Sequence, residues 1–406
     1  MKKILFLSII SLAIIKAPQC QELETIAGRI SPKELAISPS PAFDLMGASP
    51  SQITRTADIK DFKVDWSLRY GINPNFAIQS QPIWEIFFNK RDLSKYQSAS
   101  NLMRRLASID LSLGTIQDAN SYRRVGGAIK FNVFRQKDPL MEKELYEDIG
   151  LKYISEKKNL QQQLKEVKEK LDTIKNILEK PALRVQIKTI EEQLSTLHSR
   201  RMAEINERAK IFVGEYWNSS SLDVAFGRMY TFMSDSAATF GMRKNSRSTG
   251  WGAWINGNMG IGNKILVSGL FRMFWYQDQV DFLLKDLSTD VETPQTAIGN
   301  NSLFSMGLNF RYGGSIHTFF AEILYERKKV NSAKGCLDGA YEVPVNSEVV
   351  SSSLNWDVVN PNTVTFGGDW RMYRGGIISY GLRSVFDSNW KFKTFAPIIT
   401  LSCMMR

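Results

Sequence analysis

Cysteine and histidine are scarce in this chain, which has three cysteines and two histidines among 406 residues. The sequence therefore offers no disulfide framework and no Cys/His spacing typical of a metal site. His198 lies in a polar helical region and His317 shares a strand face with Phe319, so neither is placed to act as a general base. No phosphate-binding loop or nucleophile elbow is found. The sequence predicts a protein that is not an enzyme and that holds no metal and no cofactor.

Long apolar runs are missing except at the start, where MKK is followed by ILFLSIISLAII and then by KAPQCQE. This order is typical of a secretory signal peptide over residues 1–20, and Cys20 leaves acylation as the alternative to ordinary cleavage. No run of 18 apolar residues follows, which excludes a membrane protein with spanning helices. The formal net charge is +11, and loss of the three lysines in residues 1–20, which contain no acid, lowers it to +8. Without a dense basic block, nucleic acid is not a predicted partner.

Two-residue alternation of apolar and polar side chains dominates the remainder of the chain. Residues 303–326 read LFSMGLNFRYGGSIHTFFAEILYE, two alternating runs joined at Gly313 and Gly314, which predicts a β-hairpin. Similar runs begin near residues 62, 76, 102, 122, 207, 220, 248, 263, 302, 315, 362, 375 and 391. Aromatic residues such as Trp275, Tyr312 and Trp370 fall where runs end, as in interfacial girdles. A soluble antiparallel sheet with exposed charges is the alternative.

The predicted fold class is all-β, an antiparallel transmembrane β-barrel of about 14 strands in the cell outer membrane, with lipid outside and water inside. The runs supply thirteen strands, at 62–136 and 208–406. The N-terminal segment 21–61 has four of the thirteen prolines of the chain between Pro32 and Pro50, which disfavours a regular central strand. It therefore either contributes the fourteenth strand or threads the lumen as a plug.

Residues 137–207 have a different period. Leucine, isoleucine and valine recur at heptad spacing on both sides of Pro181, first at Leu160, Leu164, Val167, Leu171, Ile174 and Leu178, and then at Leu183, Ile187, Ile190, Leu194 and Leu197. Pro181 should end the first helix, so the pattern predicts an inserted antiparallel coiled-coil hairpin. Counting strands back from the C-terminus, with short turns in the periplasm, places this arm outside the cell. It is either a solvated spacer or an arm that docks a ligand or a surface protein.

Seven charged residues on the polar strand faces are candidates for lining the lumen. They are Arg272, Arg311, Glu322, Glu326, Asp369, Arg371 and Arg383. Such residues form either a charge ladder along a selective pore or internal salt bridges that close the barrel. The sequence does not decide between these two arrangements.

The signal peptide, the alternating spans, the aromatic belts and the Pro-rich preamble together resemble bacterial outer-membrane β-barrels, over residues 24–406. The stretch SPAFDLMGASPSQITR is similar to the openings of barrels from the Bacteroidota, and the design resembles long-chain fatty acid transporters, which pack an N-terminal segment inside the barrel. The C-terminal ITLSCMMR lacks the usual terminal aromatic, and the helical insertion has no counterpart in that family.

The resemblance implies a barrel in outer-membrane lipid that passes or binds a small-molecule ligand, for which an apolar compound is one candidate. The alternative is a non-conducting structural or docking barrel that uses the arm to bind a partner protein.

Overall fold

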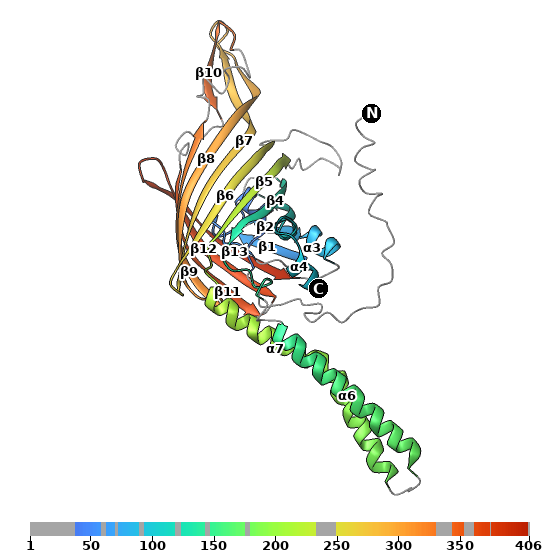
Figure 1. Cartoon of the computed structure of the whole chain (residues 1–406). Helices are drawn as coiled ribbons and strands as arrows, with labels where there is room; N and C mark the ends of the chain where they lie inside the picture. The colour runs from blue at the N-terminus through green and yellow to red at the C-terminus, as the bar shows by residue number, and fades with distance from the viewer. Residues whose placement is uncertain are drawn as a thin grey trace, which may run out of the picture.

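The chain forms a closed antiparallel β-barrel with a segment inside the ring and helices at one end, as seen in the computed structural model (Figure 1). The structure describes residues 37–404 except 58–61, 70–71, 89–92, 118–122, 143–146, 175–178, 233–248, 330–342, 353–360 and 374. The expected signal peptide and the first part of the N-terminal segment lie outside the described residues.

In the described part of the chain, thirteen strands form one sheet, and twelve of them close the ring. These twelve are β1 Lys63–Arg69, β2 Ile72–Ser80, β3 Asp110–Gln117, β4 Arg123–Arg135, β5 Ser221–Phe232, β6 Thr249–Ile261, β7 Ile265–Asp286, β8 Glu292–Gly313, β9 His317–Lys329, β11 Asn362–Tyr373, β12 Gly376–Phe386 and β13 Phe392–Met404. Neighbours in the chain pair antiparallel around the wall, and β1 pairs with β13 to complete it. The remaining strand, β10 Ser347–Ser352, pairs with the far end of β7 outside the ring.

The expected number of about fourteen strands is therefore wrong. The stretch near residue 207, taken for a strand, is part of a helix that ends at Tyr216. The described part of the N-terminal segment, 37–57, contains no strand and lies inside the barrel. The run near 102 begins as a helix, and the strand there starts only at Asp110.

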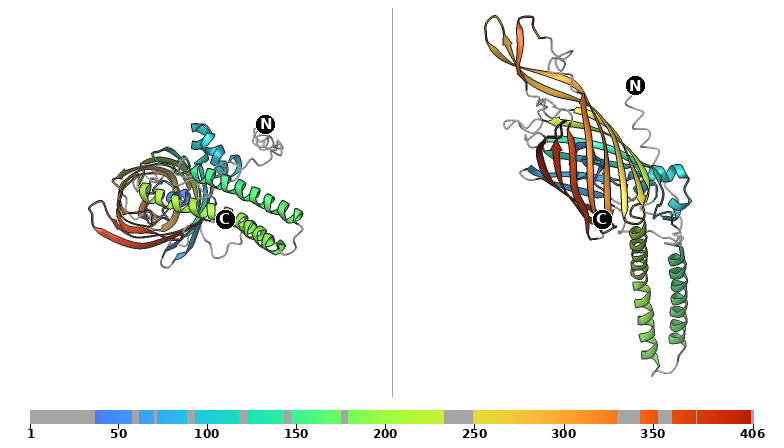
Figure 2. Two further views of the ribbon diagram at one scale, coloured as in Figure 1. Left: turned by 60° about the horizontal axis from the view of Figure 1, so that its bottom comes forward. Right: turned by 90° about the vertical axis from the view of Figure 1, so that its left-hand side faces the viewer.

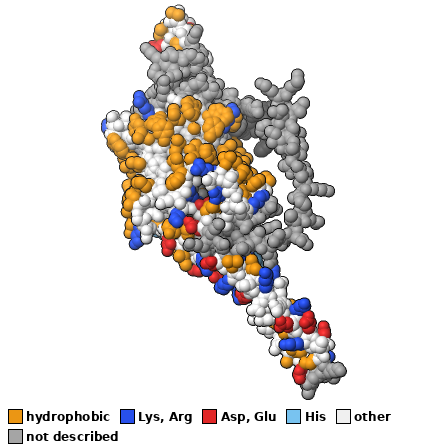
Figure 3. Space-filling model, viewed as in Figure 1, with side chains coloured by type: hydrophobic (Ala, Val, Ile, Leu, Met, Phe, Trp, Pro, Cys, Tyr) orange, Lys and Arg blue, Asp and Glu red, His pale blue; other side chains and the backbone are white. Residues whose placement is uncertain are grey.

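Each strand of the wall has one exposed apolar face and one buried mixed face. On β9, Ile323 is 54% exposed, whereas Glu322 is 1% exposed and Leu324 is fully buried. Apolar side chains spread over the outer wall in Figure 3, and charged side chains of both signs gather on the helical arm. A closed ring leaves no unpaired strand edge, and with an apolar exterior this is the architecture of outer-membrane β-barrels.

Two strands are much longer than the rest. β7 and β8 have 22 residues each and pair along almost their whole length. β6 pairs with β7 only as far as Gln277, so the outer part of the β7–β8 hairpin extends past the rim, where β10 joins it. This protrusion and the long connections from β5 to β6 and from β9 to β11 lie at one end of the barrel, here called the long-loop end.

Helices occupy the opposite end. Three short ones link β2 to β3, namely α3 Pro82–Phe87, α4 Leu93–Ser98 and α5 Asn101–Ala107. The two long helices α6 Glu147–Thr173 and α7 Lys180–Tyr216 form an arm between β4 and β5. Pro181 begins α7 rather than ending α6, in keeping with the tolerance of the first helical turn for proline. None of the described helices has the length and apolar character needed to cross a bilayer.

The arm lies at the short-turn end of the barrel, whereas the strand count from the sequence put it at the long-loop end. Trp217, at the end of α7, donates its indole N–H to the carbonyl of Asn263, 2.9 Å away, in the tight turn between β6 and β7. The turns between β8 and β9 and between β11 and β12 are at the same end, and so is the end of β13. The false strand near 207 added one strand to the count back from the C-terminus, so that count inverted the arm and every connection that precedes it in the chain. Figure 2 shows the arm projecting away from the β7–β8 hairpin.

Candidate functional site: the plugged lumen and the arm base

The lumen is occupied by residues 37–56, here called the plug. Its first part forms the short helix α2 Pro41–Met46, with Ser40 as N-cap, Pro41 in the first turn and Gly47 in the left-handed conformation (φ 68°) at its end. All six helical residues are buried. The sequence offered a strand or a plug for this segment, and the structure has the plug.

Apolar side chains of the plug pack against small residues of the wall. Leu45 and Ile53 belong to a buried cluster with Ala128, Ala225 and Trp254. Glycines on β5 and β6 provide the space, because a Cβ on Gly227 or Gly252 would lie 2.8 Å from a methyl group of Leu45. The inner wall is thus shaped to the helix that it encloses.

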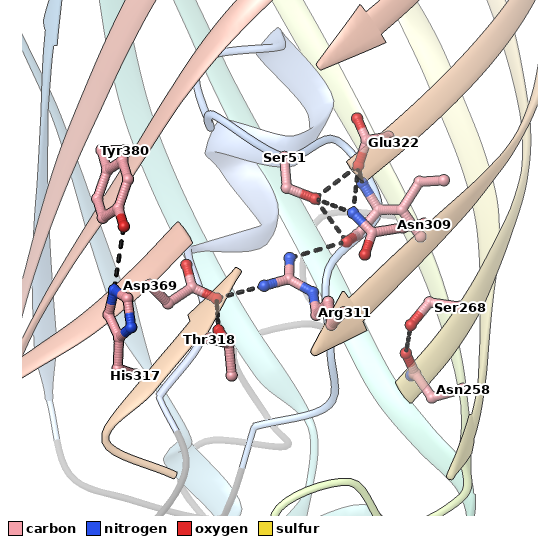
Figure 4. Close-up of polar contacts among 11 residues, drawn as sticks. Ser51, Asn258, Ser268, Asn309, Arg311, His317, Thr318, Glu322, Asp369 and Tyr380 are labelled. Atoms are coloured by element: carbon pink, nitrogen blue, oxygen red, sulfur yellow. Dashed lines mark hydrogen bonds and ion pairs between the residues drawn. The ribbon is translucent and has the colours of Figure 1, made fainter. Parts of the chain in front are cut away.

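Glu322 on β9 is the main acceptor for the second half of the plug (Figure 4). Its carboxylate accepts hydrogen bonds from Ser51 Oγ at 2.6 Å, Gln52 N at 3.0 Å and Ile53 N at 3.1 Å. Asn309 on the neighbouring β8 donates its Nδ2 to the same carboxylate at 2.9 Å. A buried carboxylate with four donors is fully engaged, and bonds of this charge-assisted kind are the stronger ones.

Two arginines on other strands of the wall also donate hydrogen bonds to the plug. Arg383 on β12 donates to the carbonyl oxygens of Ser49 at 2.6 Å, Pro50 at 3.2 Å and Gly47 at 3.3 Å. Arg272 on β7 donates to Gln52 Oε1 at 2.7 Å and forms an ion pair with Glu326 at 3.1 Å.

The remaining predicted residues lie nearer the short-turn end. Arg311 forms an ion pair with Asp369 and also donates to the carbonyl of Ile53 at 3.5 Å. Arg371 is half-buried, shares the strand face of Asp369, and donates its backbone N–H to the carbonyl of Ile316. Six of the seven residues, all except Arg371, are thus described in ion pairs with one another or in hydrogen bonds to the plug.

Several plug-binding residues were not among the candidates. Lys63 on β1 is fully buried, donates to the carbonyl of Ser38 and pairs with Asp65 at 2.9 Å. Asp65 in turn accepts from Ser40 N at 2.6 Å. Lys130 on β4 is buried and interacts electrostatically with Asp223, with Asp110 of β3 and with Asp44 of the plug. The alternation placed Lys63, Asp65 and Lys130 on polar faces, so the signal was present, but the sequence does not show which face residues meet.

An open space remains between the plug and the wall. A cavity of about 390 Å³ is bordered by Leu45 and Met46 of the plug, by Phe274 and Leu303 of the wall, and by the cations Arg124, Arg272 and Arg383. Its lining is mixed, with apolar surface beside positive charge. Among the described residues no group of three or more His, Cys, Asp or Glu side chains could hold a metal ion.

The base of the arm packs against the helices between β2 and β3 in a second hydrophobic core, here called the joint. It contains residues from α3 to α5, from the segment before α6, and from both arm helices: Trp84, Phe88, Tyr96, Ala107, Leu140, Ile149, Tyr153, Leu197, Ile205 and Val213. Tyr96 donates its hydroxyl to Asp138 at 2.8 Å, and burial together with this carboxylate raises the pKa of Tyr96 well above its usual range. The phenol is therefore a permanent donor inside the joint.

The plug and the arm base also meet. Thr56, at the end of the plug, donates its hydroxyl to the carboxylate of Asp223 at 2.6 Å. Asp223 is the third residue of β5, close to the point where the chain passes from the arm into the wall. Arg55 and Thr56 line a small cleft together with Val213 and Trp217 of the α7 end. In the left view of Figure 2 the end of α7 passes across the mouth of the barrel. The end of α7 therefore lies at the short-turn mouth, beside Arg55 and Thr56 of the plug.

No protein-family model matches the chain, and no curated protein matches its sequence. Among solved structures, the chain is similar to the KdgM porin in complex with a disordered oligogalacturonate, at 5% identity and a TM-score of 0.34, over 85% of this chain and 99% of that one. It is also similar to a Pseudomonas aeruginosa FadL homologue, at 7% identity and a TM-score of 0.32, over 91% and 98% of the two chains. The β domain of the Bordetella autotransporter BrkA aligns at 9% identity and a TM-score of 0.32, over 85% and 98%. The assignment of the barrel rests on the strand pairing and two-faced strands described above.

Proposed function

We propose that this outer-membrane β-barrel is a plugged anchor for its helical arm, and that the arm docks a partner protein on the periplasmic side. The observation that carries the proposal is the joint, which packs the base of the arm against α3 to α5, the helices that connect β2 to β3 of the barrel. Each large apolar side chain buried there contributes about 1.5–3 kcal/mol. An arm that served only as a solvated spacer would not need a base held in this way.

The turns support the periplasmic side. Outer-membrane barrels have short turns in the periplasm and long loops outside. The arm shares its end of the barrel with the short turns, for example the one that Trp217 contacts. Helix α7 has 37 residues, so at about 1.5 Å per residue it reaches roughly 55 Å from the barrel.

The outer part of the arm has a surface suited to docking. Exposed, uncharged side chains recur at helical spacing on one face of α7, at Ala182, Val185, Thr189, Gln193 and Thr196. The hydroxyl groups of both threonines are bonded to carbonyls of their own helix, which leaves their methyl groups at the surface. A stripe of this kind fits a groove or a second helix of a partner.

Site-specific photocrosslinking in intact cells tests this proposal. A benzophenone side chain at Val185 should give a discrete adduct with one periplasmic protein, whereas the same group at Val345, exposed at the long-loop end, should not. Loss of the adduct when Thr189 is changed to Lys would map the contact to the stripe. Absence of an adduct at Val185, Thr189 and Thr196 alike would refute docking through this face.

A second candidate function is binding or passage of a small ligand, which the lumenal cavity favours. Its size lies within the range of small-molecule sites, and its lining combines apolar and cationic groups. Conductance recording in planar bilayers distinguishes passage through the lumen from a plugged anchor. We expect no steady conductance from the wild-type protein because the plug occupies the lumen, and steady conductance would favour passage.

A further inference from the structure

The helices α3 to α5, here called the ledge, expose apolar side chains on the side that faces away from the joint. Trp84 and Phe88 are buried in the joint, yet Ile86 is 78% exposed and Phe87 is 43% exposed on the same helix. On α5, Ala107 is buried while Leu102 is 67% exposed. Helices this short bury one face through the joint, so the apolar residues on the opposite face require another explanation.

The ledge is continuous with the lipid-facing wall. It connects the short-turn ends of β2 and β3, and the backbone N–H of Asn132 on β4 donates to Ser108 Oγ, directly after α5, at 3.1 Å. The outward face of β3 begins a few residues later with Leu111 and Leu113, both exposed. Figures 1 and 2 show these helices beside the ring, outside its circumference, rather than beneath its mouth. The exposed apolar groups of the ledge therefore extend the apolar belt at its lower margin.

Positive charge accompanies the apolar groups. Lys95 on α4 lies 4.3 Å from the centre of the Phe87 ring, and Arg104 and Arg105 occupy the last turn of α5. Neither α4 nor α5 contains an acidic residue, and the described ledge has one acid, Glu85. Short amphipathic helices that combine aromatic and aliphatic groups with lysine and arginine are typical of the membrane interface.

We propose that the ledge is an interfacial foot that binds the phospholipid surface of the periplasmic leaflet. Ile86, Phe87 and Leu102 enter the upper acyl region, while Lys95 and Arg105 bind phosphate groups of the lipids. Because the ledge shares the joint with α6 and α7, the bilayer surface then sets the angle at which the arm leaves the membrane. This inference concerns lipid binding and does not depend on a protein partner of the arm.

Depth-dependent fluorescence quenching tests the foot. The full-length protein, with serine at Cys20, Cys336 and Cys403, receives an NBD-labelled cysteine in place of Leu102 and is placed in nanodiscs of phosphatidylcholine and phosphatidylglycerol. Nitroxide lipids labelled near the headgroup should quench this NBD and its emission should lie to the blue. The same label at Leu113, on the lipid-facing wall, is the positive control, and at Val185, on the outer arm, the negative control. Heat-modifiable migration on gels verifies the fold of each variant.

Charge is tested separately. Arg105→Gln should weaken quenching at position 102 in discs with phosphatidylglycerol and have less effect in discs of phosphatidylcholine alone, because the headgroup attraction is electrostatic. Water-like, unquenched emission at position 102 would overturn the proposal. A blue-shifted emission that nitroxide lipids do not quench would also overturn it, since the ledge would then be covered by protein, such as a second copy of this chain.

Discussion

Replacing Glu322 by glutamine should release the second half of the plug without opening the barrel wall. The side chain keeps its size, but a carboxamide has one acceptor oxygen instead of two. In the native lumen Oε2 accepts from Ser51 Oγ, Ile53 N and Asn309 Nδ2, and Oε1 accepts from Gln52 N. The best orientation of the glutamine leaves its NH₂ group against the N–H of Gln52, so that this backbone donor loses its partner.

The magnitude follows from these four bonds. The orphaned amide of Gln52 costs about 1–3 kcal/mol, and each of the other three bonds loses about 1 kcal/mol on passing from a charged to a neutral acceptor. The lower desolvation cost of a neutral amide offsets part of this sum, which leaves about 4 kcal/mol. At about 1.4 kcal/mol per tenfold change, the open state of the plug should become roughly 1,000-fold more populated.

Amide hydrogen exchange in nanodiscs measures this opening directly. Peptides containing Gln52 and Ile53 should lose about three powers of ten in protection, while peptides from β11 and β12 keep theirs. Glu292→Gln, an exposed acid on the β8 extension, is the matched control and should change nothing. Protection at Gln52 and Ile53 within tenfold of the wild type would refute the reasoning, because the carboxylate would then not hold the plug.

Three further predictions concern the arm and the wall. In a variant with serine at the native cysteines, a cysteine at Leu287 should react with an impermeant maleimide on intact cells, and one at Glu179 only after the outer membrane is breached; the reverse would place the arm outside the cell. Replacing residues 161–189 by a short Gly/Ser loop should leave a heat-modifiable barrel, since the joint is retained, and loss of insertion would contradict this. Ile205→Asp should destabilise the joint by about 4 kcal/mol or more, seen as a lower melting temperature of the helical circular-dichroism signal, with the exposed Ile211→Asp as control.

The strands were predictable because a wall between lipid and a polar interior requires apolar and polar side chains to alternate at every second residue. Along β9, Phe319, Ile323 and Tyr325 are exposed and alternate with buried positions, as the sequence pattern indicates. The helix at 205–216 was misread because Ile211, Phe212 and Val213 form a compact apolar run of residue types common in strands. The helical signal was the four-residue spacing of Ile205, Ala209 and Val213, all buried in the structure.

The plug-binding site was predictable only in part. The alternation of apolar and polar residues predicts that Glu322 and Arg383 lie on the inner wall. The position of one strand relative to another on a different side of the ring cannot be read from the sequence of either strand. The contacts of Lys63 and Lys130 also depend on where α2 sits inside the ring, which is a tertiary property. The joint escaped prediction for a similar reason, because Trp84 and Ile205 are more than a hundred residues apart in the chain.

The pairing of β1 with β13 has a consequence for how the barrel assembles. Among the described ring strands it joins the two elements that are farthest apart in the chain, with about 330 residues between Arg69 and Ile398, and closing such a loop costs about 5 kcal/mol of chain entropy. The plug contacts strands on both sides of this closure, accepting a hydrogen bond from Ser67 of β1 at the Ala48 carbonyl and from Arg383 of β12 at Ser49. A segment made before any strand thus contacts the first strand and the next-to-last strand of the ring, so we expect it to act as an internal template on which the ring closes.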